Sequence, residues 1–147
     1  MYGVIMEVTI DRIKHSLAVA KRMKELSEND SEKYPVIPED AFILGLLHDV
    51  GYEFVDNQME HAQKGGIVLK QQGYKYWKEV YYHGYSQNEY ISPMLELLNY
   101  ADITTGPTGE YTTIEQRIIG VKERYGEDSI QLEEIIALAD MILNNNR

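Results

Sequence analysis

Cysteine is absent from this chain of 147 residues. Without thiols the chain can form neither a disulfide nor a Cys-based structural zinc site, and nothing in its composition requires an oxidising compartment. Residues 1–7 lack a basic region and have too short an apolar stretch for a signal peptide. We therefore expect a cytoplasmic protein.

Long apolar runs are absent as well. No stretch approaches the ~18 apolar residues of a membrane-spanning helix, so no membrane partner is expected. The 44% of apolar residues and 26% of charged residues are ordinary for a soluble globular protein. The length suits a single domain over residues 1–147, because such a chain can bury ~68–70% of its unfolded surface around one core.

Positive charge is scarce. The chain has 14 Lys and Arg against 24 Asp and Glu, a formal net charge of −10, and its positive residues form no visible basic patch. Such a chain repels the phosphates of a nucleic-acid polymer, so we expect no partner of that kind. A phosphorylated small molecule is still a candidate partner, because bound metal can supply local positive charge.

Strand patterns are weak, except in the aromatic-rich residues 74–83, which suit either a helix or a strand. Helical periodicity predicts an all-α fold, a single compact bundle of six to seven helices. Pro38, the pair Ser92-Pro93 and a capping box from Thr113 to Gln116 mark helix starts. The predicted helices cover about residues 10–29, 38–50, 59–72, 74–83, 93–102, 113–126 and 129–144.

Apolar residues predict which helix faces are buried. In the first helix, His15 lies beside a stripe with the 3.6-residue helical period, formed by Ile10, Ile13, Leu17, Ala20 and Met23. The helix at 38–50 is apolar on every side over residues 41–50, which indicates burial in a core.

The adjacent pair His48-Asp49 lies within Gly45-Leu46-Leu47-His48-Asp49-Val50-Gly51, in that predicted buried helix. An ionised aspartate there needs a partner, because burying an unpaired carboxylate costs many kcal/mol. A metal ion shared with histidines meets this need. A hydrogen-bonded core pair is the alternative interpretation.

The other histidines can reach the same site, because they occur at spacings that suit separate helices. Successive helix residues diverge by about 100°, so His48 and Asp49 can flank a cation from two sides. One oxygen of Asp49 can then contribute to a first metal site and the other oxygen to a second. The first is completed by His15, His48 and Asp102, and the second by His61 and His83. Such ligands suit Fe, Mn, Co, Ni or Zn and disfavour an all-oxygen calcium site.

These residues resemble the HD-domain superfamily of metal-dependent phosphohydrolases, which are all-helical proteins named after the adjacent His-Asp pair. The resemblance spans roughly residues 10–105 and is carried by His15, the run 45–51 and Asp102. It implies that these residues hold one divalent metal, and that His61 and His83 are the extra histidines of members with two. Residues 113–144 are expected to form C-terminal helices outside this motif-bearing core.

The resemblance implies hydrolysis of a small-molecule phosphoester, with a nucleotide as one candidate, by a metal-activated water. Asp49 is the expected catalytic bridge between the metals. Lys64, one turn from His61, is a candidate to contact the phosphate or to protonate the leaving group. Two alternatives stay open, an HD-fold di-iron oxygenase with the same ligands and a non-catalytic nucleotide-sensing module. His-Glu-x-x-His, P-loop and Gly-x-Gly-x-x-Gly motifs are absent, so a zinc protease or a nucleotide-binding fold of those kinds has no support.

Overall fold

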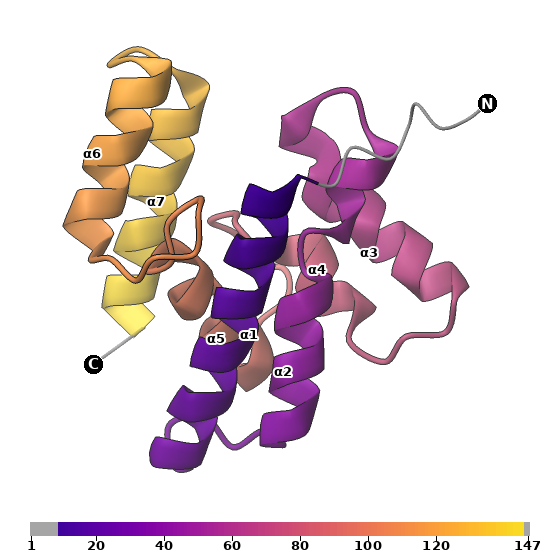
Figure 1. The fold of residues 1–147 in the computed structure, drawn as a ribbon. Helices are drawn as coiled ribbons and strands as arrows, with labels where there is room; N and C mark the ends of the chain where they lie inside the picture. The colour runs from indigo at the N-terminus through magenta and orange to yellow at the C-terminus, as the bar shows by residue number, and fades with distance from the viewer. Residues whose placement is uncertain (1–8, 146–147) are drawn as a thin grey trace.

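Helices make up the regular structure of the computed structural model, which describes residues 9–145 (Figure 1). No β-strand occurs in this part of the chain, so the all-α prediction is confirmed. The α-helices are α1 (Ile10–Asn29), α2 (Pro38–Leu47), α3 (His61–Gln71), α4 (Trp77–Tyr82), α5 (Pro93–Ile103), α6 (Ile114–Tyr125) and α7 (Ile130–Asn145). Two 3₁₀ helices, η1 (Val50–Phe54) and η2 (Gln58–Glu60), lie between α2 and α3. Residues 1–7, for which no signal peptide is predicted, lie outside the described residues.

Side-chain caps start the helices where the sequence predicts them. The hydroxyl of Thr9 accepts a hydrogen bond from the third residue after it, as does the hydroxyl of Ser92, which precedes a proline at the first helical position. Thr113 and Gln116 form both bonds of the predicted capping box. These local bonds satisfy backbone N–H groups that have no partner within the helix.

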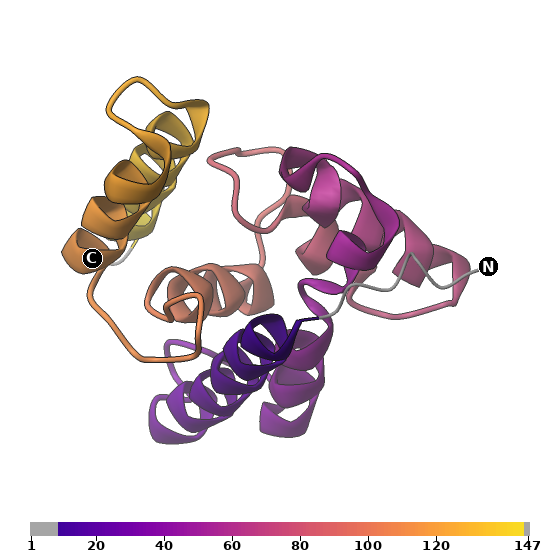
Figure 2. The same ribbon diagram turned by 45° about the horizontal axis from the view of Figure 1, so that its top comes forward.

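Two apolar clusters hold the helices together, and α5 belongs to both. The larger cluster joins α1 to α5, and its largest fully buried side chains are Met23, Leu44, Leu97 and Leu98. The smaller cluster packs Ile103 of α5 against Leu138, Ala139 and Ile142 of α7. Figure 2 shows α5 between the α1–α2 pair and the α6–α7 pair. Through α5 the C-terminal helices are therefore fixed relative to the first helices.

The predicted buried stripe of α1 is wrong in its first half. The exposed fractions there are 65% for Ile10, 49% for Ile13 and 38% for Leu17. The buried line instead runs through His15, Val19 and Met23, which are successive neighbours at i, i+4 and i+8. α1 has apolar residues on two sides, and only its packing against α2 and α5 decides which side is covered.

α2 is neither buried on every side nor long enough to contain the His48-Asp49 pair. Ile43 and Leu46 are 47% and 42% exposed, and the helix ends at Leu47. His48 is its C-cap, and Asp49, with φ −102° and ψ 13°, precedes η1. The directions of these two side chains are therefore not set by the 100° step of a helix. Neither α2 nor any other helix within residues 9–145 is long and apolar enough to cross a membrane.

Close contact between η1 and α3 depends on two glycines. A Cβ atom on Gly51 would overlap the carbonyl oxygen of His61, and one on Gly65 would lie 2.9 Å from the backbone nitrogen of Gly51. The backbone of Gly51 therefore lies directly against α3 at Gly65. This contact sets the position of His61, at the start of α3, relative to the segment that carries Asp49.

Gly65→Ala should lower the free energy of unfolding by about 1–3 kcal/mol, because the added methyl group must displace the backbone of Gly51. Gly120→Ala is the matched control. Gly120 is also helical, but the nearest atom to an added Cβ is 4.0 Å away. Alanine there should raise the free energy of unfolding by roughly 0.5–1 kcal/mol. Urea denaturation measures both variants, and equal stabilities would contradict the tight contact between η1 and α3.

Candidate metal centre

Backbone carbonyls fix the orientation of three of the four histidine rings. In each ring Nδ1 lies at hydrogen-bond distance from a carbonyl oxygen, which only accepts, so Nδ1 carries the proton and donates it. The pairs are His15 with Gly106 at 2.8 Å, His48 with Gly45 at 2.6 Å, and His83 with Val80 at 2.6 Å. In the neutral ring, Nε2 then has a lone pair available for a cation.

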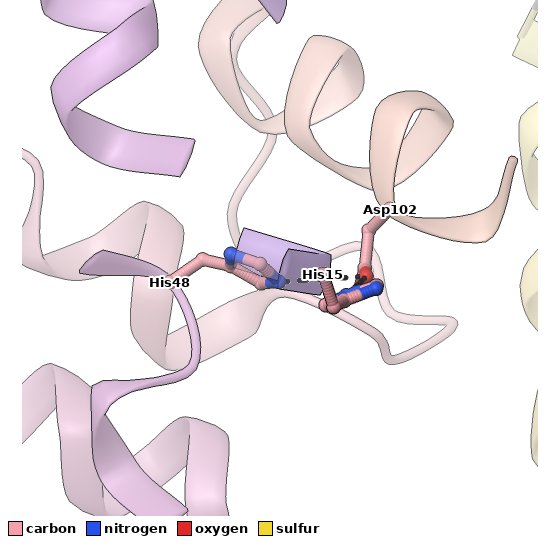
Figure 3. A group of neighbouring side chains, drawn as sticks. All are labelled: His15, His48 and Asp102. Carbon is pink, nitrogen blue, oxygen red and sulfur yellow. Dashed lines mark hydrogen bonds and ion pairs between the residues drawn. The ribbon is translucent and has the colours of Figure 1, made fainter. Parts of the chain in front are cut away.

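The Nε2 atoms of His15 and His48 meet two aspartates, and these four side chains are called the first set. His15 Nε2 lies 2.9 Å from Asp102 Oδ1 and 3.6 Å from Asp49 Oδ2. His48 Nε2 lies 3.2 Å from Asp49 Oδ2 and 3.4 Å from Asp102 Oδ1. Figure 3 shows His15, His48 and Asp102 of this set, which come from α1, from the end of α2 and from α5.

The other oxygen of Asp49 faces a second set, which it forms with His61 and His83. Its Oδ1 atom lies 3.3 Å from His61 Nε2 and 3.5 Å from His83 Nε2. The two Nε2 atoms are themselves 3.3 Å apart. The structure thus brings together all six histidines and aspartates that the sequence singles out. It also divides them between the two oxygens of Asp49 in the predicted way.

His48 Nε2 requires a cation beside it. This atom is fully buried and has no hydrogen-bond donor within residues 9–145, while oxygens of Asp49 and Asp102 face it. A lone pair that faces only carboxylate oxygens is repelled unless a proton or a metal ion lies between them. The sequence predicts such a need for Asp49, and the structure shows that His48 shares it.

In the metal-free protein a proton on His48 meets this requirement. Burial by itself would lower the pKa of His48, but the charges of Asp49 and Asp102 outweigh burial and raise this pKa well above its ordinary value. Burial would likewise raise the pKa of each carboxyl. The charge of protonated His48 instead holds the pKa values of Asp49 and Asp102 well below their usual range.

Both sets fit a divalent transition metal. Imidazole nitrogen together with carboxylate oxygen is a donor set for Fe, Mn, Co, Ni or Zn. Two atoms that each bind one ion at ~2.1 Å lie roughly 3–3.5 Å apart. The distances within the two sets run from 2.9 to 3.6 Å, close to this range. His15, His48 and Asp102 form one close group of potential ligands, and His48, Asp49 and His83 form another.

Two helix ends add to the negative potential of the site. His48 is the C-cap of α2, and Asp102 lies in the last turn of α5. A helix C-terminus carries a partial charge of about −0.5. Both helices therefore favour a cation at the point where their ligands meet.

Five of the six side chains in the two sets, all but the fully buried His48, line a pocket of about 350 Å³. Its other walls carry positive and aromatic side chains, namely Arg12, Tyr52, Arg117, Arg124 and Tyr125. The guanidinium carbon of Arg12 lies 3.8 Å from the centre of the Tyr52 ring. This ring stacks on His61, with ring centres 4.0 Å apart and ring planes 8° apart. The pocket thus gathers three arginines in a chain whose net charge is −10.

Arg117 joins α6 to the end of α5. Its Nη1 donates to the carbonyl oxygen of Asp102 at 2.7 Å and also to that of Thr105. The next carbonyl, that of Gly106, accepts the hydrogen bond from His15 Nδ1. Arg117 therefore holds the segment that positions both Asp102 and the ring of His15.

Lys64, the other predicted catalytic residue, is not brought into this pocket. It lies exposed on α3 and is not among the residues that line the pocket walls. Arg12 is not among the residues predicted from the sequence, although it lies one turn before His15 on α1, and its i, i+3 spacing from His15 is a signal that the sequence contains. Arg124 and Tyr125 gave no such signal, because they come from α6, outside the motif-bearing core.

The fold and the site define an all-α protein with a buried His/Asp cation site beside an arginine-lined pocket. The family model of the HD domain matches residues 12–145, and the chain belongs to the HD domain family. Membership of this family implies the metal-dependent hydrolase superfamily, and two groups of His and Asp side chains in residues 9–145 could hold a metal ion. The match includes the C-terminal helices as well as the motif-bearing core. Neither the curated proteins nor the solved structures include a match to this chain.

Asp49→Ala should remove both metals, because each oxygen of this carboxylate serves one set. His83→Ala should remove only the second metal and leave the first set intact. Elemental analysis after gel filtration of manganese-loaded protein gives the metal content per chain. Asp140→Ala, at an exposed aspartate of α7, is the control that should keep the wild-type content. If Asp49→Ala also kept that content, the bridging role would be refuted.

The stability that a metal adds should grow with pH. Because the pKa of His48 is raised in the folded, metal-free protein, its proton contributes stability fully below the unfolded pKa of about 6.5. This contribution is lost as the pH rises through the raised value. A metal ion replaces the proton, so the difference in Tm between manganese-loaded and EDTA-treated protein should be larger at about pH 8.5 than at about pH 6. Thermal unfolding followed by circular dichroism measures it, and a constant difference would contradict the argument.

Proposed function

We propose that this protein is a metal-dependent phosphohydrolase that cleaves a phosphoester of a small molecule, with a nucleotide as one candidate. The observation that carries the proposal is the position of Asp49. Its two oxygens face two separate histidine sets at a pocket lined by three arginines. The first set would hold one divalent ion and the second set another.

Metal ions in the two sets would supply a Lewis acid for a phosphoryl oxygen and would lower the pKa of water from 15.7 to roughly 7. The net charge of the metal centre follows from the ions together with the side chains that would hold them. Two divalent ions would carry +4, and Asp49 and Asp102 carry −2, so the centre would be positive. A phosphate group is therefore attracted to this pocket although the whole chain is acidic.

Arg12 and Arg124 are the residues to which we assign phosphate binding. A guanidinium group can donate two parallel hydrogen bonds to a phosphate, which fixes its orientation as well as its position. Arg117 has a different role, because its Nη1 already donates to the carbonyl oxygens of Asp102 and Thr105. We therefore treat Arg117 as a positioning residue for the first set.

Tyr52 is suited to hydrogen-bond the substrate. Burial, together with the charges of Asp49 and Asp102, raises the pKa of its hydroxyl above the ordinary value, so the group stays protonated and remains a donor. Its stacking on His61 also restrains that ring in the second set. Tyr125, 44% exposed at the same pocket, offers an aromatic face for a nucleotide base.

The three arginines supply the phosphate-binding cations that hydrolysis of a phosphoester requires. An HD-fold di-iron oxygenase would use the same six ligands and would consume O₂ together with an organic substrate. A nucleotide-sensing module would use the same arginines without turnover. The two alternatives therefore differ from the proposal in what the protein consumes and releases.

The direct test is a panel of phosphomonoesters, phosphodiesters and nucleotides, each assayed with Mn, Fe, Co, Ni, Zn and Mg. Metal-dependent release of product is expected from the wild type, and a loss of roughly 1,000-fold or more from Asp49→Ala, since metal catalysis contributes several kcal/mol. Asp140→Ala should keep full activity. Consumption of O₂ by the iron-loaded protein without hydrolysis would favour the oxygenase, and nucleotide binding without turnover would favour the sensor.

Arg124→Ala should lower kcat/KM by about 10–100-fold, because a hydrogen bond to a charged group contributes roughly 1.5–3 kcal/mol. Lys64→Ala is the control, since its exposed side chain does not line the pocket. We expect it to keep kcat/KM within about two-fold of the wild type. A larger loss from Lys64→Ala than from Arg124→Ala would restore Lys64 to the catalytic role predicted from the sequence.

A further inference from the structure

A second pocket, of about 140 Å³, shares no lining residue with the metal pocket. It is bounded by α5, α7, residues 33–34 of the α1–α2 connection and the segment before α5. Its side chains include aromatic rings and aliphatic groups, among them Tyr34, Tyr90, Ile91, Leu95 and Ile142. Nothing in the proposed hydrolysis uses this pocket.

The segment before α5 is held rigidly at the edge of this pocket. The hydroxyl groups of Tyr90 and Ser92 both donate to Oε2 of Glu79, at 2.7 and 2.8 Å. Glu79 is only 3% exposed, and its carboxylate therefore fixes two neighbouring points of the segment from inside the protein. The pocket wall is thus formed before any ligand binds.

Asn99 places an unused donor in the pocket. Its side chain is 2% exposed, and its Oδ1 accepts a hydrogen bond from the backbone nitrogen of Gly84 at 2.9 Å. That bond fixes which amide atom is which, so Nδ2 points elsewhere. In the part of the chain that the structure describes, Nδ2 has no hydrogen-bond partner. Because Nδ2 is not one of the fully buried side-chain atoms that lack a partner in these residues, it stays accessible from the pocket, where an acceptor atom on a ligand can bond to it.

The size and charge of the pocket restrict the ligand. An engineered apolar cavity of roughly 150 Å³ binds benzene, so the volume here suits one six-membered ring. Lys33 and Glu96 contribute opposite charges to the lining. Burial, and then the neighbouring Tyr100 and Glu96, raise the pKa of Tyr34 to about 12, so these surroundings disfavour an added negative charge. A neutral ligand is favoured over an anionic one.

We propose that this pocket binds a neutral, planar, single-ring molecule with a carbonyl oxygen or ring nitrogen that accepts a hydrogen bond from Asn99 Nδ2. The same side chain connects the pocket to the metal centre, because its Oδ1 holds the backbone of Gly84 directly after His83. The proposal therefore includes an effect of occupancy on metal binding in the second set, since a ligand bonded to Nδ2 would restrain the side chain whose Oδ1 holds Gly84. By thermodynamic linkage, metal binding changes the affinity for the ring molecule by the same factor.

Benzamide is the probe for this site, used with the full-length, manganese-loaded protein. It combines one neutral ring with a carbonyl acceptor, whereas benzoate has the same shape with a negative charge and benzene has no acceptor. Calorimetry or ligand-observed NMR should show saturable 1:1 binding of benzamide, at least about 10-fold tighter than binding of either analogue. Equal affinities for benzamide and benzoate, or no saturable binding, would overturn the proposal.

Ile91→Trp identifies the pocket without risk to the core, because Ile91 is 63% exposed at its edge. The larger ring should fill the pocket and weaken benzamide binding at least 10-fold. Ile119→Trp, at a 55% exposed position on α6, is the matched control and should bind benzamide like the wild type. If both variants bound benzamide equally, the ligand would occupy another place and the proposal would be wrong.

Two measurements test the connection between this pocket and the metal centre: the effect of Asn99→Ala, and the effect of benzamide on manganese affinity. Asn99→Ala should weaken benzamide binding about 10-fold and should also weaken manganese binding at the second set, since it removes the bond to Gly84. In the wild type, saturating benzamide should shift the dissociation constant for this second manganese at least about three-fold. The shift should disappear in Ile91→Trp. An unchanged constant in the wild type would refute the connection to the metal centre.

Discussion

The hydrogen bond from a histidine Nδ1–H to a backbone carbonyl is the interaction on which this site depends. Three rings make it, to Gly45, Val80 and Gly106. Each bond selects one tautomer and turns the other nitrogen, with its lone pair, toward carboxylate oxygens. Acceptors that face acceptors repel one another, so the folded chain needs a cation at this point. The proton on His48 meets this need in the metal-free protein, and a metal ion can replace it.

This need accounts for the positions of His48 and Asp102 at the C-terminal ends of two helices. His48 caps α2, Asp102 closes α5, and Asp49 stands between α2 and η1. A ligand at a helix end adds the partial negative charge of that end to its own. Asp49, outside any α-helix, can turn its two oxygens to different partners. Two carboxylates and two helix C-termini thus face the point that favours a cation, while arginines from α1 and α6 lie on other walls of the same pocket.

α5 is the helix that connects the two hydrophobic clusters and the two pockets of the protein. Its apolar residues belong to both hydrophobic clusters, so it fixes the C-terminal helices against α1 and α2. Its last turn supplies Asp102 to the first set, and Arg117 of α6 donates to the carbonyl oxygen of the same residue. One turn earlier, Asn99 holds the backbone after His83 and lines the second pocket. A displacement of α5 would therefore move lining residues of both pockets.

The sequence by itself determined where helices form, several of their caps, and the six histidines and aspartates that lie together around the two oxygens of Asp49. It could do so because imidazoles are few and because periodicity and capping are local properties. Tertiary structure alone decided which side of α1 is buried, that α2 ends before His48, and that Arg124 rather than Lys64 lines the pocket. It also decided the tautomers, which depend on the carbonyls of Gly45, Val80 and Gly106. Every residue has a carbonyl, so only the packing of the folded chain determines which ones meet a histidine.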